Sequence, residues 1–262
     1  MTVDCVALLL GRKGSKGLPG KNTMKILGRP ISHYSIMAAK NSKHISDIYV
    51  STDDDQIKYE AEQFNIEIID RPDELCTDDA LFEDALIHGY KEIIRRRNKK
   101  PEMLVILMCN VATIDNKLID DAISALINDD DADSAVTVSV LNMYSPLRAR
   151  KLDENGYLKP FVPFESFGDP ASLSCDRDSQ GDVFFADMSH SVSRSRALDD
   201  LDNGLLPQRW MGKKILPIYN SYGCDIDLIW QVYASKWWLE DKHFSETETP
   251  YDCSFQEKQN KY

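Results

Sequence analysis

The order of apolar and polar positions along the first 140 residues predicts strands and helices in alternation. Short runs rich in aliphatic residues predict strands, at residues 3–10, 47–52, 66–70, 103–108 and 134–140. The stretches between them predict helices, at residues 31–42, 55–65, 81–98 and 116–129. Strands that alternate with helices usually pair in parallel, with helices on both faces of the sheet. We therefore expect an α/β fold with a doubly wound, mostly parallel sheet of the Rossmann-like type.

The pattern changes after residue 141. A hairpin is predicted around the turn Asn155–Gly156, and the stretch 165–181 has few apolar residues and predicts a loop. Two further strands and a last helix follow, at residues 182–188, 213–219 and 228–242. The second part of the chain therefore interrupts the regular alternation before returning to it.

The length of 262 residues suits one α/β domain with a small addition. We interpret residues 1–242 as that domain, with an excursion at about 143–181, and residues 243–262 as a polar C-terminal tail. The aromatic and proline content of the excursion indicates a contact between two copies of the chain.

Composition excludes several classes of protein. The net charge of −12 argues against nucleic-acid binding, since phosphate contacts need Lys and Arg clustered over a wide face. No apolar run approaches the length of a membrane-spanning helix, and the N-terminus lacks the features of a signal peptide. The six cysteines form no CxxC pair and no His cluster accompanies them, which indicates reduced thiols. We expect a cytoplasmic protein without nucleic-acid or membrane partners.

One segment departs from the acidic character of the chain. Between Asp4 and Asp47 there is no acidic residue, whereas eight Lys or Arg residues lie there. Four glycines, all within residues 8–22, coincide with this charge. A glycine-rich loop between a strand and a helix presents backbone N–H groups to phosphates. The pattern predicts a site for a small anion, and a solvated basic surface is the alternative.

Two common phosphate-binding fingerprints fail in this loop. A Walker A loop that ends at Gly20 and Lys21 requires an earlier glycine, and Ser or Thr directly after the lysine. This chain has Ser15 and Asn22 at those two positions. A dinucleotide fingerprint that ends at Gly20 fails at Ser15 as well. These mismatches exclude a P-loop kinase and a nicotinamide-dependent dehydrogenase.

The run GRKGSKGLPGKN, from Gly11 to Asn22, resembles the nucleotide-binding signature of the CMP-sialic acid synthetase family, the N-acylneuraminate cytidylyltransferases. Their loop has the form A-R-x-G-S-K-x-x-x-x-K-N, and Gly11 stands where the family usually has Ala. Other segments resemble family motifs in the same order, at residues 50–54, 70–80, 152–161, 181–189 and 224–239. The resemblance covers roughly residues 3–240.

The resemblance implies a nucleotidyltransferase that couples CTP with a 2-keto-3-deoxy sugar acid, a small acidic acceptor, and releases pyrophosphate. It also implies a homodimer whose contact is the excursion. Such a transfer needs charge neutralisation and in-line positioning more than covalent catalysis. The resemblance assigns the leaving phosphates to three cations, Arg12, Lys16 and Lys21. It assigns nucleotide contacts to Gly11, Gly14, Ser15, Gly17, Asn22 and Arg71.

Asp225 and Asp227 are the predicted metal ligands. Carboxylates at positions i and i+2 of an extended segment point the same way, because side chains alternate. Paired carboxylates suit Mg²⁺, the expected cofactor. The pattern alone is common, and the resemblance and the position before a helix favour the metal role over capping of that helix. Helix capping explains Asp53 and Asp54 equally well, so both are left out of the site.

The largest departure from the family pattern follows the fourth predicted strand. The family usually reads L-Q-P-T-S-P-L-R in a segment that faces the sugar acid, whereas this chain reads LMCNVATID at residues 107–115. We expect acceptor contacts from Cys109, which replaces the Gln, from Asn110, and from Arg177 and Gln180. The altered segment leaves two alternatives open. One is a different acceptor, such as a non-sialic ulosonic acid or a phosphonate, and the other is a CTP-binding protein without catalysis.

Overall fold

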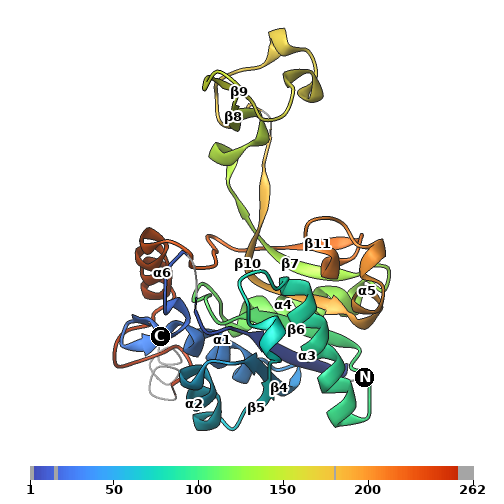
Figure 1. Cartoon of the computed structure of the whole chain (residues 1–262), viewed down its shortest axis with the longest axis vertical. Helices are drawn as coiled ribbons and strands as arrows, with labels where there is room; N and C mark the ends of the chain where they lie inside the picture. The colour runs from blue at the N-terminus through green and yellow to red at the C-terminus, as the bar shows by residue number, and fades with distance from the viewer. Residues whose placement is uncertain (1–2, 15–16, 180, 253–262) are drawn as a thin grey trace, which may run out of the picture.

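A seven-stranded sheet runs through the body of the molecule in the order β11-β7-β10-β6-β1-β4-β5 (Figure 1). The computed structural model describes residues 3–14, 17–179 and 181–252. The strands of this sheet are β1 (Cys5–Leu10), β4 (Ile45–Thr52), β5 (Glu67–Asp70), β6 (Met103–Met108), β7 (Ser134–Val140), β10 (Phe184–Arg194) and β11 (Ile215–Tyr219). All neighbouring strands pair in parallel except β10, which is antiparallel to β6 and β7.

Helices cover both faces of the sheet. Their bounds are α1 (Ile31–Lys40), α2 (Asp55–Gln63), α3 (Phe82–Arg97), α4 (Asn116–Asn128), α5 (Ser195–Asp199) and α6 (Ile229–Asp241). Helices α1, α2 and α4 pack on one face, and α3 and α5 pack on the other. Alternate residues of β1 belong to the two cores, which explains why this strand is apolar throughout. The predicted doubly wound, mostly parallel α/β fold is confirmed.

Strand β10 differs most from the sequence-based prediction. The predicted strand ends at residue 188, whereas β10 continues to Arg194 and lies between β6 and β7. The added stretch alternates Ser with larger residues and is buried. Ser189 Oγ lies 3.2 Å from Thr113 Oγ1, and Ser191 Oγ accepts a hydrogen bond from Trp210 Nε1 at 3.2 Å. These partners are distant in the sequence, so a local polarity pattern does not reveal the strand.

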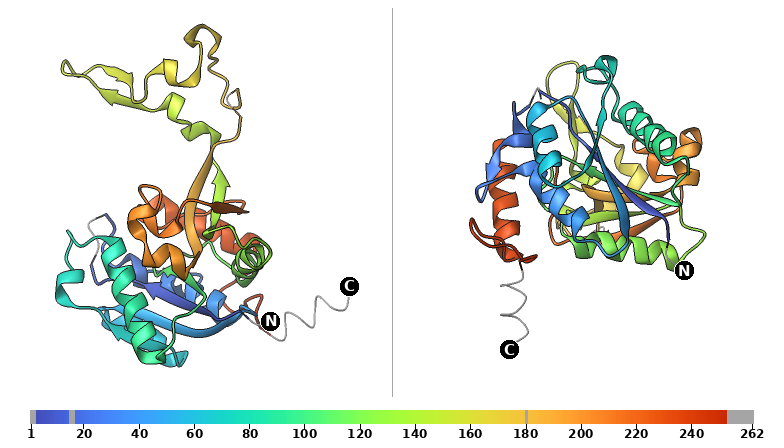
Figure 2. Two further views of the ribbon diagram at one scale, coloured as in Figure 1. Left: turned by 90° about the vertical axis from the view of Figure 1, so that its right-hand side faces the viewer. Right: turned by 90° about the horizontal axis from the view of Figure 1, so that it is seen from below.

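A long arm, residues 141–183, protrudes from the body between β7 and β10 (Figures 1 and 2). Within it, β8 (Arg150–Leu152) and β9 (Leu158–Pro160) form an antiparallel hairpin. Gly156 lies in the turn with a φ of 83°, in the left-handed region that favours glycine. The hairpin predicted around this turn is therefore confirmed.

The chain beyond α6 turns back onto the body. Phe244 is buried, and its ring packs edge-on against Tyr34 and Tyr251, with centroids 5.7 and 5.8 Å apart. A short hairpin of β2 (Lys25–Ile26) and β3 (Arg29–Pro30) contributes Ile26 to the same cluster. The first part of the predicted polar tail is thus packed, and residues 253–262 lie outside the described part of the chain. None of the described helices has the length and apolar character needed to cross a membrane.

Candidate functional site

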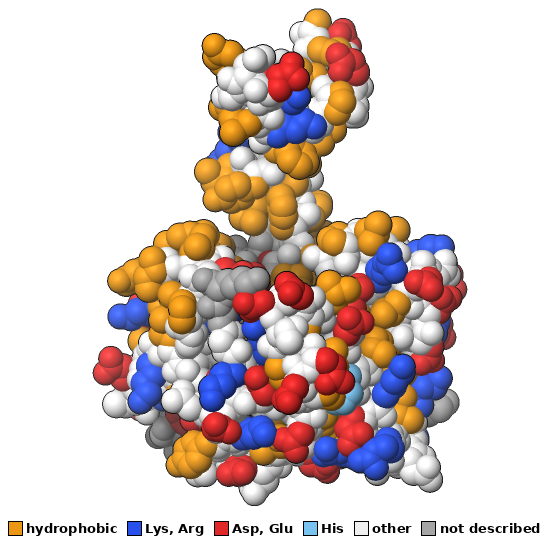
Figure 3. Space-filling model, viewed as in Figure 1, with side chains coloured by type: hydrophobic (Ala, Val, Ile, Leu, Met, Phe, Trp, Pro, Cys, Tyr) orange, Lys and Arg blue, Asp and Glu red, His pale blue; other side chains and the backbone are white. Residues whose placement is uncertain are grey.

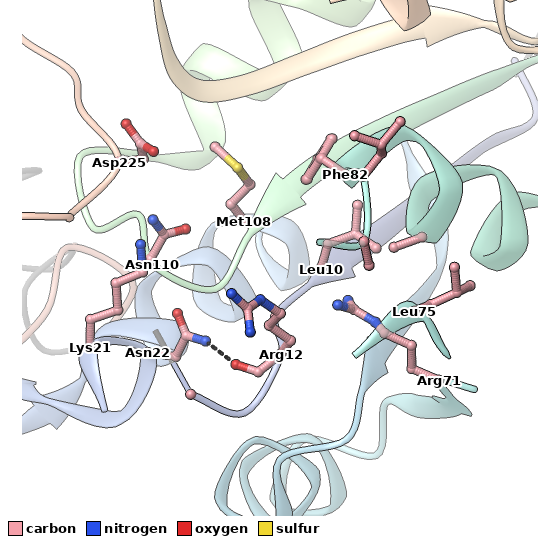
Figure 4. A pocket seen from close by; sticks show the side chains of 15 residues that line it. Leu10, Arg12, Lys21, Asn22, Arg71, Leu75, Phe82, Met108, Asn110 and Asp225 are labelled. Carbon is pink, nitrogen blue, oxygen red and sulfur yellow. Dashed lines mark hydrogen bonds between the residues drawn. The ribbon is translucent and has the colours of Figure 1, made fainter. Parts of the chain in front are cut away.

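A pocket of about 250 Å³ opens at the carboxyl ends of β1 and β6 (Figure 4). Parallel α/β sheets usually bind their ligands at this edge. The walls come from the glycine loop (residues 11–22), the turn after β5 with the start of α3, the end of β6, and the D-I-D segment (residues 225–227). The predicted site residues that line the pocket are Gly11, Arg12, Gly14, Lys21, Asn22, Arg71, Asn110 and Asp225.

The glycine loop takes its shape from two glycines and one asparagine. Gly14 and Gly20 have φ angles of 79° and 72°, a conformation that residues with a side chain rarely adopt. The buried Asn22 donates from Nδ2 to the carbonyl oxygen of Arg12 at 3.0 Å (Figure 4). This bond ties the two ends of the loop together. The loop can therefore hold its cations and its backbone at the edge of the pocket.

Two cations of the glycine loop line the pocket, and each is ion-paired with a carboxylate from another segment. Arg12 donates from Nη2 to Asp78 Oδ1 at 2.6 Å. Lys21 Nζ contacts Asp227 Oδ1, and the lysine side chain is only 14% exposed. These pairs hold both cations beside the pocket. An anion that enters the pocket competes with the two carboxylates for the same cations.

Arg71 brings another guanidinium to the pocket from the segment after β5. Its Nη2 donates to the carbonyl oxygen of Ser51 at 2.8 Å, and its Nε donates to Ser51 Oγ at 3.3 Å. Arg12 and Arg71 point toward the same space (Figure 4). Burial and, to a smaller extent, the charge of Arg12 lower the pKa of Arg71. Two converging guanidinium groups favour an anionic or strongly polar group between them.

Asp225 faces the pocket from the side opposite Arg71 (Figure 4). Burial raises the pKa of its carboxyl group, and the charge of Asp227 raises it further, whereas Lys21 lowers it. A cation between the two carboxylates would relieve this repulsion, and their oxygen atoms are the donors that Mg²⁺ prefers. In the described part of the chain, no group of three or more His, Cys, Asp or Glu is arranged so that it could hold a metal ion. The pair therefore fits a Mg²⁺ ion whose other ligands are water or substrate oxygens.

Neither aspartate of the D-I-D segment caps α6, so the capping alternative is wrong. Gln231 performs that role, because its Oε1 accepts from the backbone N–H groups of Asp227 and Leu228 at 2.8 and 2.7 Å. Capping does explain Asp54, which accepts a backbone N–H at the start of α2 at 2.9 Å. Its neighbour Asp53 accepts a backbone N–H of the glycine loop at 2.7 Å. Asp53 thus links the loop to the end of β4.

The segment that departs from the family pattern, residues 107–115, faces the protein interior for most of its length. Cys109 is fully buried, and burial raises the pKa of its thiol to about 12. A Cβ atom at Gly11 would lie 2.6 Å from Cys109 Cβ, so the absent side chain leaves room for the thiol beneath the loop. The structure therefore does not bring Cys109 to the pocket, contrary to the expected acceptor contact. Asn110 does line the pocket.

The remaining predicted residues divide into three groups. Arg177 lies on the arm, pairs with Asp178 at 3.1 Å and does not line the pocket. Gly17 approaches the D-I-D segment so closely that a Cβ would lie 3.0 Å from the carbonyl oxygen of Asp227. Ser15, Lys16 and Gln180 lie outside the described residues. Within one chain, the pocket is therefore lined by three cationic residues, Arg12, Lys21 and Arg71, and by Asp225. Arg177 does not line it.

Sequence reasoning missed the apolar wall of the pocket. That wall is formed by Leu75, Ala80, Leu81, Phe82 and Ala85. These residues belong to the turn after β5 and to the first turns of α3. The available signal was an apolar cluster directly after a polar loop, which also fits an ordinary helix start. An apolar wall next to converging cations can accept a flat ring that carries a charged substituent.

Comparisons with known proteins show that the chain is similar to cytidylyltransferases. A family model described as cytidylyltransferase matches residues 6–155. The chain is 36% identical over 89 residues to the N-acylneuraminate cytidylyltransferase of Escherichia coli O18:K1:H7, a match that covers 34% of this chain and 21% of that protein. It is 40% identical over 74 residues to the CMP-N,N'-diacetyllegionaminic acid synthase of Legionella pneumophila, covering 28% and 32% of the two chains.

The fold has a counterpart among solved structures. A CMP:2-keto-3-deoxy-manno-octonic acid synthetase complexed with CTP superposes with a TM-score of 0.64 and 14% identity, covering 90% of this chain and 98% of the other. At that identity the likeness concerns the fold alone. The chain spans about a fifth to a third of the length of the first curated relatives it matches.

Proposed function

Because the chain belongs to the cytidylyltransferases, in the family of the CMP-sialic acid synthetases, we propose that it transfers CMP from CTP to a 2-keto-3-deoxy sugar acid. The acceptor hydroxyl oxygen bonds to the α-phosphorus, the bond to the β-phosphate breaks, and the hydroxyl proton passes to solvent. Pyrophosphate is the second product. The observation that carries the proposal is that Arg12, Arg71, the glycine loop and Asp225 line one and the same pocket.

The cations of the glycine loop would bind the β- and γ-phosphates. Each now faces one carboxylate, Asp78 for Arg12 and Asp227 for Lys21. A triphosphate offers more negative charge than one carboxylate, so both cations exchange their partners for phosphate oxygens. Charge builds up on the leaving pyrophosphate in the transition state, and a positioned lysine and arginine stabilise it. Gly14 carries no side chain that would keep a phosphate away from the loop backbone.

Arg71 and the apolar wall would bind the cytosine and ribose. Two of the guanidinium nitrogens of Arg71 are anchored on Ser51, which fixes the direction of the third. The apolar wall that includes Leu75 and Phe82 lies beside it (Figure 4). A pyrimidine presents carbonyl and ring-nitrogen acceptors to a fixed guanidinium and an apolar face to the wall. Asn22 keeps the loop closed against the nucleotide.

We propose Mg²⁺ as the cofactor, held by Asp225 and Asp227. A divalent ion held there would supply positive charge against the negative charge that develops on the substrate phosphates. Asp225 would supply an oxygen from inside the pocket, and Asp227, which is 53% exposed and paired with Lys21, would supply a second one. When Lys21 turns to a phosphate, Asp227 loses its ammonium partner and becomes available to the metal ion.

The acceptor is proposed to be a sialic-acid-like sugar acid. The relatives named above act, by their names, on N-acylneuraminate and N,N'-diacetyllegionaminic acid. Of the departing segment, Asn110 lines the pocket and Cys109 does not. Most of the altered residues of this segment therefore do not line the pocket. They support an unusual acceptor less strongly than the sequence alone indicates. A non-sialic ulosonic acid or a phosphonate is the alternative that an acceptor panel must test.

The arm supports a homodimer. The β8–β9 hairpin exposes large apolar side chains that make no core in this chain, with Tyr157 73%, Leu158 71% and Phe161 58% exposed. Apolar side chains cover much of the arm (Figure 3). Contiguous apolar surface of this kind usually marks a contact with another protein. We propose that two copies pack through the arm and that Arg177 reaches the acceptor only in that assembly.

We propose a cytoplasmic location. The five described cysteines, which include the exposed Cys175, are free thiols. Free thiols persist in reducing compartments, where disulfides are rare. Detection of the tagged protein in the cytoplasmic fraction, apart from membrane and secreted fractions, would test this placement.

The deciding experiment measures pyrophosphate release with Mg²⁺ and each of the four nucleoside triphosphates. Acceptors are N-acylneuraminic acid, legionaminic- and octulosonic-type acids and small phosphonates. We expect release with CTP and one sugar acid, and loss of release in Asp225→Asn, which keeps the shape and removes the charge. Release with another nucleotide, or with a phosphonate alone, would contradict the proposal. CTP binding without release for any acceptor would favour a nucleotide-binding protein without catalysis.

A further inference from the structure

A seam of hydrogen bonds joins the segment after β6 to the D-I-D segment. We define the seam as residues 110–113 on one side and 224–226 on the other. The backbone N–H of Ile226 donates to the carbonyl oxygen of Asn110 at 2.9 Å, and Asn110 Nδ2 donates to the carbonyl oxygen of Ile226 at 3.3 Å. Next to this pair of bonds, Val111 and Asp225 form an isolated antiparallel bridge.

Thr113 forms the other end of the seam. Its Oγ1 accepts from the backbone N–H of Cys224 at 3.1 Å and donates toward the carbonyl oxygen of Cys224 at 3.4 Å. The same oxygen lies 3.2 Å from Ser189 Oγ on β10. Thr113 is fully buried and Asn110 is only 8% exposed, so water cannot readily replace these bonds.

The seam decides where the carboxylate of Asp225 lies. Both neighbours of Asp225, Cys224 and Ile226, are tethered through their backbone N–H and C=O groups. A turn of this segment away from the pocket would break several bonds of buried groups at once. The two side chains of the seam, on Asn110 and Thr113, stand where the family motif quoted above has Pro. Proline has no side-chain hydrogen-bonding group.

We propose that Asn110 and Thr113 are positioning residues, which hold Asp225 in the pocket for a divalent cation bound with the triphosphate. The proposal rests on the proposed function, since it concerns the same pocket. The segment that departs most from the family pattern, residues 107–115, then helps to hold Asp225, which lies on the side of the site that binds the phosphates. The buried hydroxyl of Thr113 and the amide of Asn110 act on Asp225 through the backbone of residues 224–226.

The test compares two fully buried threonines, of which only Thr113 bonds to the backbone of Cys224. Thr113→Val removes the hydroxyl of the seam. Thr137→Val removes a matched hydroxyl, since Thr137 is also fully buried and its Oγ1 accepts from the backbone N–H of His190 at 3.1 Å and donates to its carbonyl oxygen at 3.0 Å. The hydrogen bonds of Thr137 join β7 to β10 and involve none of residues 224–226. Asn110→Ala is the second seam variant.

Mn²⁺ serves as the probe, because its binding to the protein with CTP can be followed by electron paramagnetic resonance without any turnover. Loss of a supporting hydrogen bond typically weakens metal binding by about 10- to 100-fold. We expect Thr113→Val and Asn110→Ala to weaken Mn²⁺ binding by about 10-fold, and Thr137→Val to leave it unchanged. Thermal unfolding should show similar losses for the two valine variants. Calorimetric binding of CTP without divalent ions should be the same in wild type and Thr113→Val.

Three outcomes are decisive. Wild-type Mn²⁺ affinity in Thr113→Val overturns the inference, and so does an equal loss in Thr137→Val, which would mean general loosening. If the wild-type chain itself binds no Mn²⁺ with CTP, the proposed function fails and the inference falls with it, which is a distinct result. Should Thr113→Val not fold, Asn110→Ala carries the test, and Thr113→Ser, which keeps the hydroxyl, should retain wild-type affinity.

Discussion

At the residue scale, two cationic side chains of the pocket are ion-paired with carboxylates of the same chain. Lys21 lies beside Asp227, and Arg12 beside Asp78, from segments far apart in the chain. In each pair the carboxylate partner is exposed to solvent, which screens the interaction and limits its contribution to stability. Their effect is instead on binding, since the cations stay beside the pocket until a stronger anion displaces the carboxylates.

Lys21→Ala should weaken CTP binding by at least about 10-fold, which corresponds to about 1.4 kcal/mol, because a charge matched to the triphosphate is lost. Lys25→Ala is the control, since Lys25 is exposed on β2 and does not line the pocket. Calorimetry with CTP and with CMP distinguishes a phosphate role from a general charge effect. Equal CTP affinity in the two variants would remove Lys21 from the site.

Gly11 and Cys109 form a second pair, in which packing decides which residues fit. Gly11→Ala should destabilise the chain by about 1–3 kcal/mol, because its Cβ would overlap the side chain of Cys109. The double variant Gly11→Ala/Cys109→Gly should recover part of that loss. Urea unfolding of the four members of this mutant cycle gives the coupling energy. Additive effects of the two substitutions would show that the close approach has no energetic consequence.

At the scale of elements, helix ends follow rules that need few residues. Asp54 caps α2, and Asp115 caps α4 by accepting the backbone N–H of Leu118 at 2.8 Å. Helix α6 instead has the apolar Leu228 at its N-cap, and the side chain of Gln231 accepts from the backbone N–H groups of Asp227 and Leu228. Short polar side chains directly before a helix satisfy backbone donors that have no partner in the first turn.

Asp54→Ala should lower the free energy of unfolding by about 1 kcal/mol, because a backbone N–H of α2 loses its acceptor. Asp54→Asn should retain most of the stability, since asparagine caps helices about as well as aspartate. Urea unfolding at neutral pH measures both. An equal loss in the two variants would point to the charge of Asp54, and not to the cap.

The end of α3 has a pH-dependent ion pair. Hydrogen bonds from Arg95 and then Arg96 lower the pKa of Glu92 to about 2 from 4.5. A depressed pKa in the folded state means that the stabilisation is present above pH 4.5 and is lost as the pH falls toward 2. The difference in unfolding free energy between wild type and Glu92→Gln should therefore shrink across that range. A difference that stays constant with pH would contradict this assignment.

At the scale of the whole molecule, the arm stands apart from the body and buries little of its own surface (Figure 2). Ordering such a segment costs conformational entropy, and the arm has no core of its own whose burial would offset that cost. A second copy that covers the arm would supply the missing burial. Closed pairs with two-fold symmetry use the same surface on both partners, so each arm would be covered by its equivalent or by the neighbouring body.

The double variant Tyr157→Ser/Phe161→Ser should convert a dimer to a monomer, because the exposed apolar surface of the β8–β9 hairpin loses its two rings. Tyr59→Ser is the control, since Tyr59 on α2 is 59% exposed but belongs to the body. Sedimentation velocity measures the mass of each species. A monomeric wild type at micromolar concentration, or a dimeric double variant, would contradict the role of the arm.

Much of the fold and half of the pocket follow from local sequence. The strands β1 and β6 are recognisable because both of their faces are buried, so their residues are apolar without interruption. The glycine loop and the D-I-D segment are recognisable by their residue types and spacing. Helix capping by Asp54 depends on a contact only two residues long. Each of these features is decided by neighbours in the chain, and sequence by itself determines them.

Tertiary structure decided the rest. The insertion of β10 between β6 and β7 buries serines whose partners lie elsewhere in the chain. The thiol of Cys109 turned inward because Gly11 leaves space above it. Thr113 reached Cys224, which is 111 residues away, and Lys21 reached Asp227 across 206 residues. The periodicity of a sequence reports which face of an element is buried, but the partner on that face is chosen only when separate segments pack together.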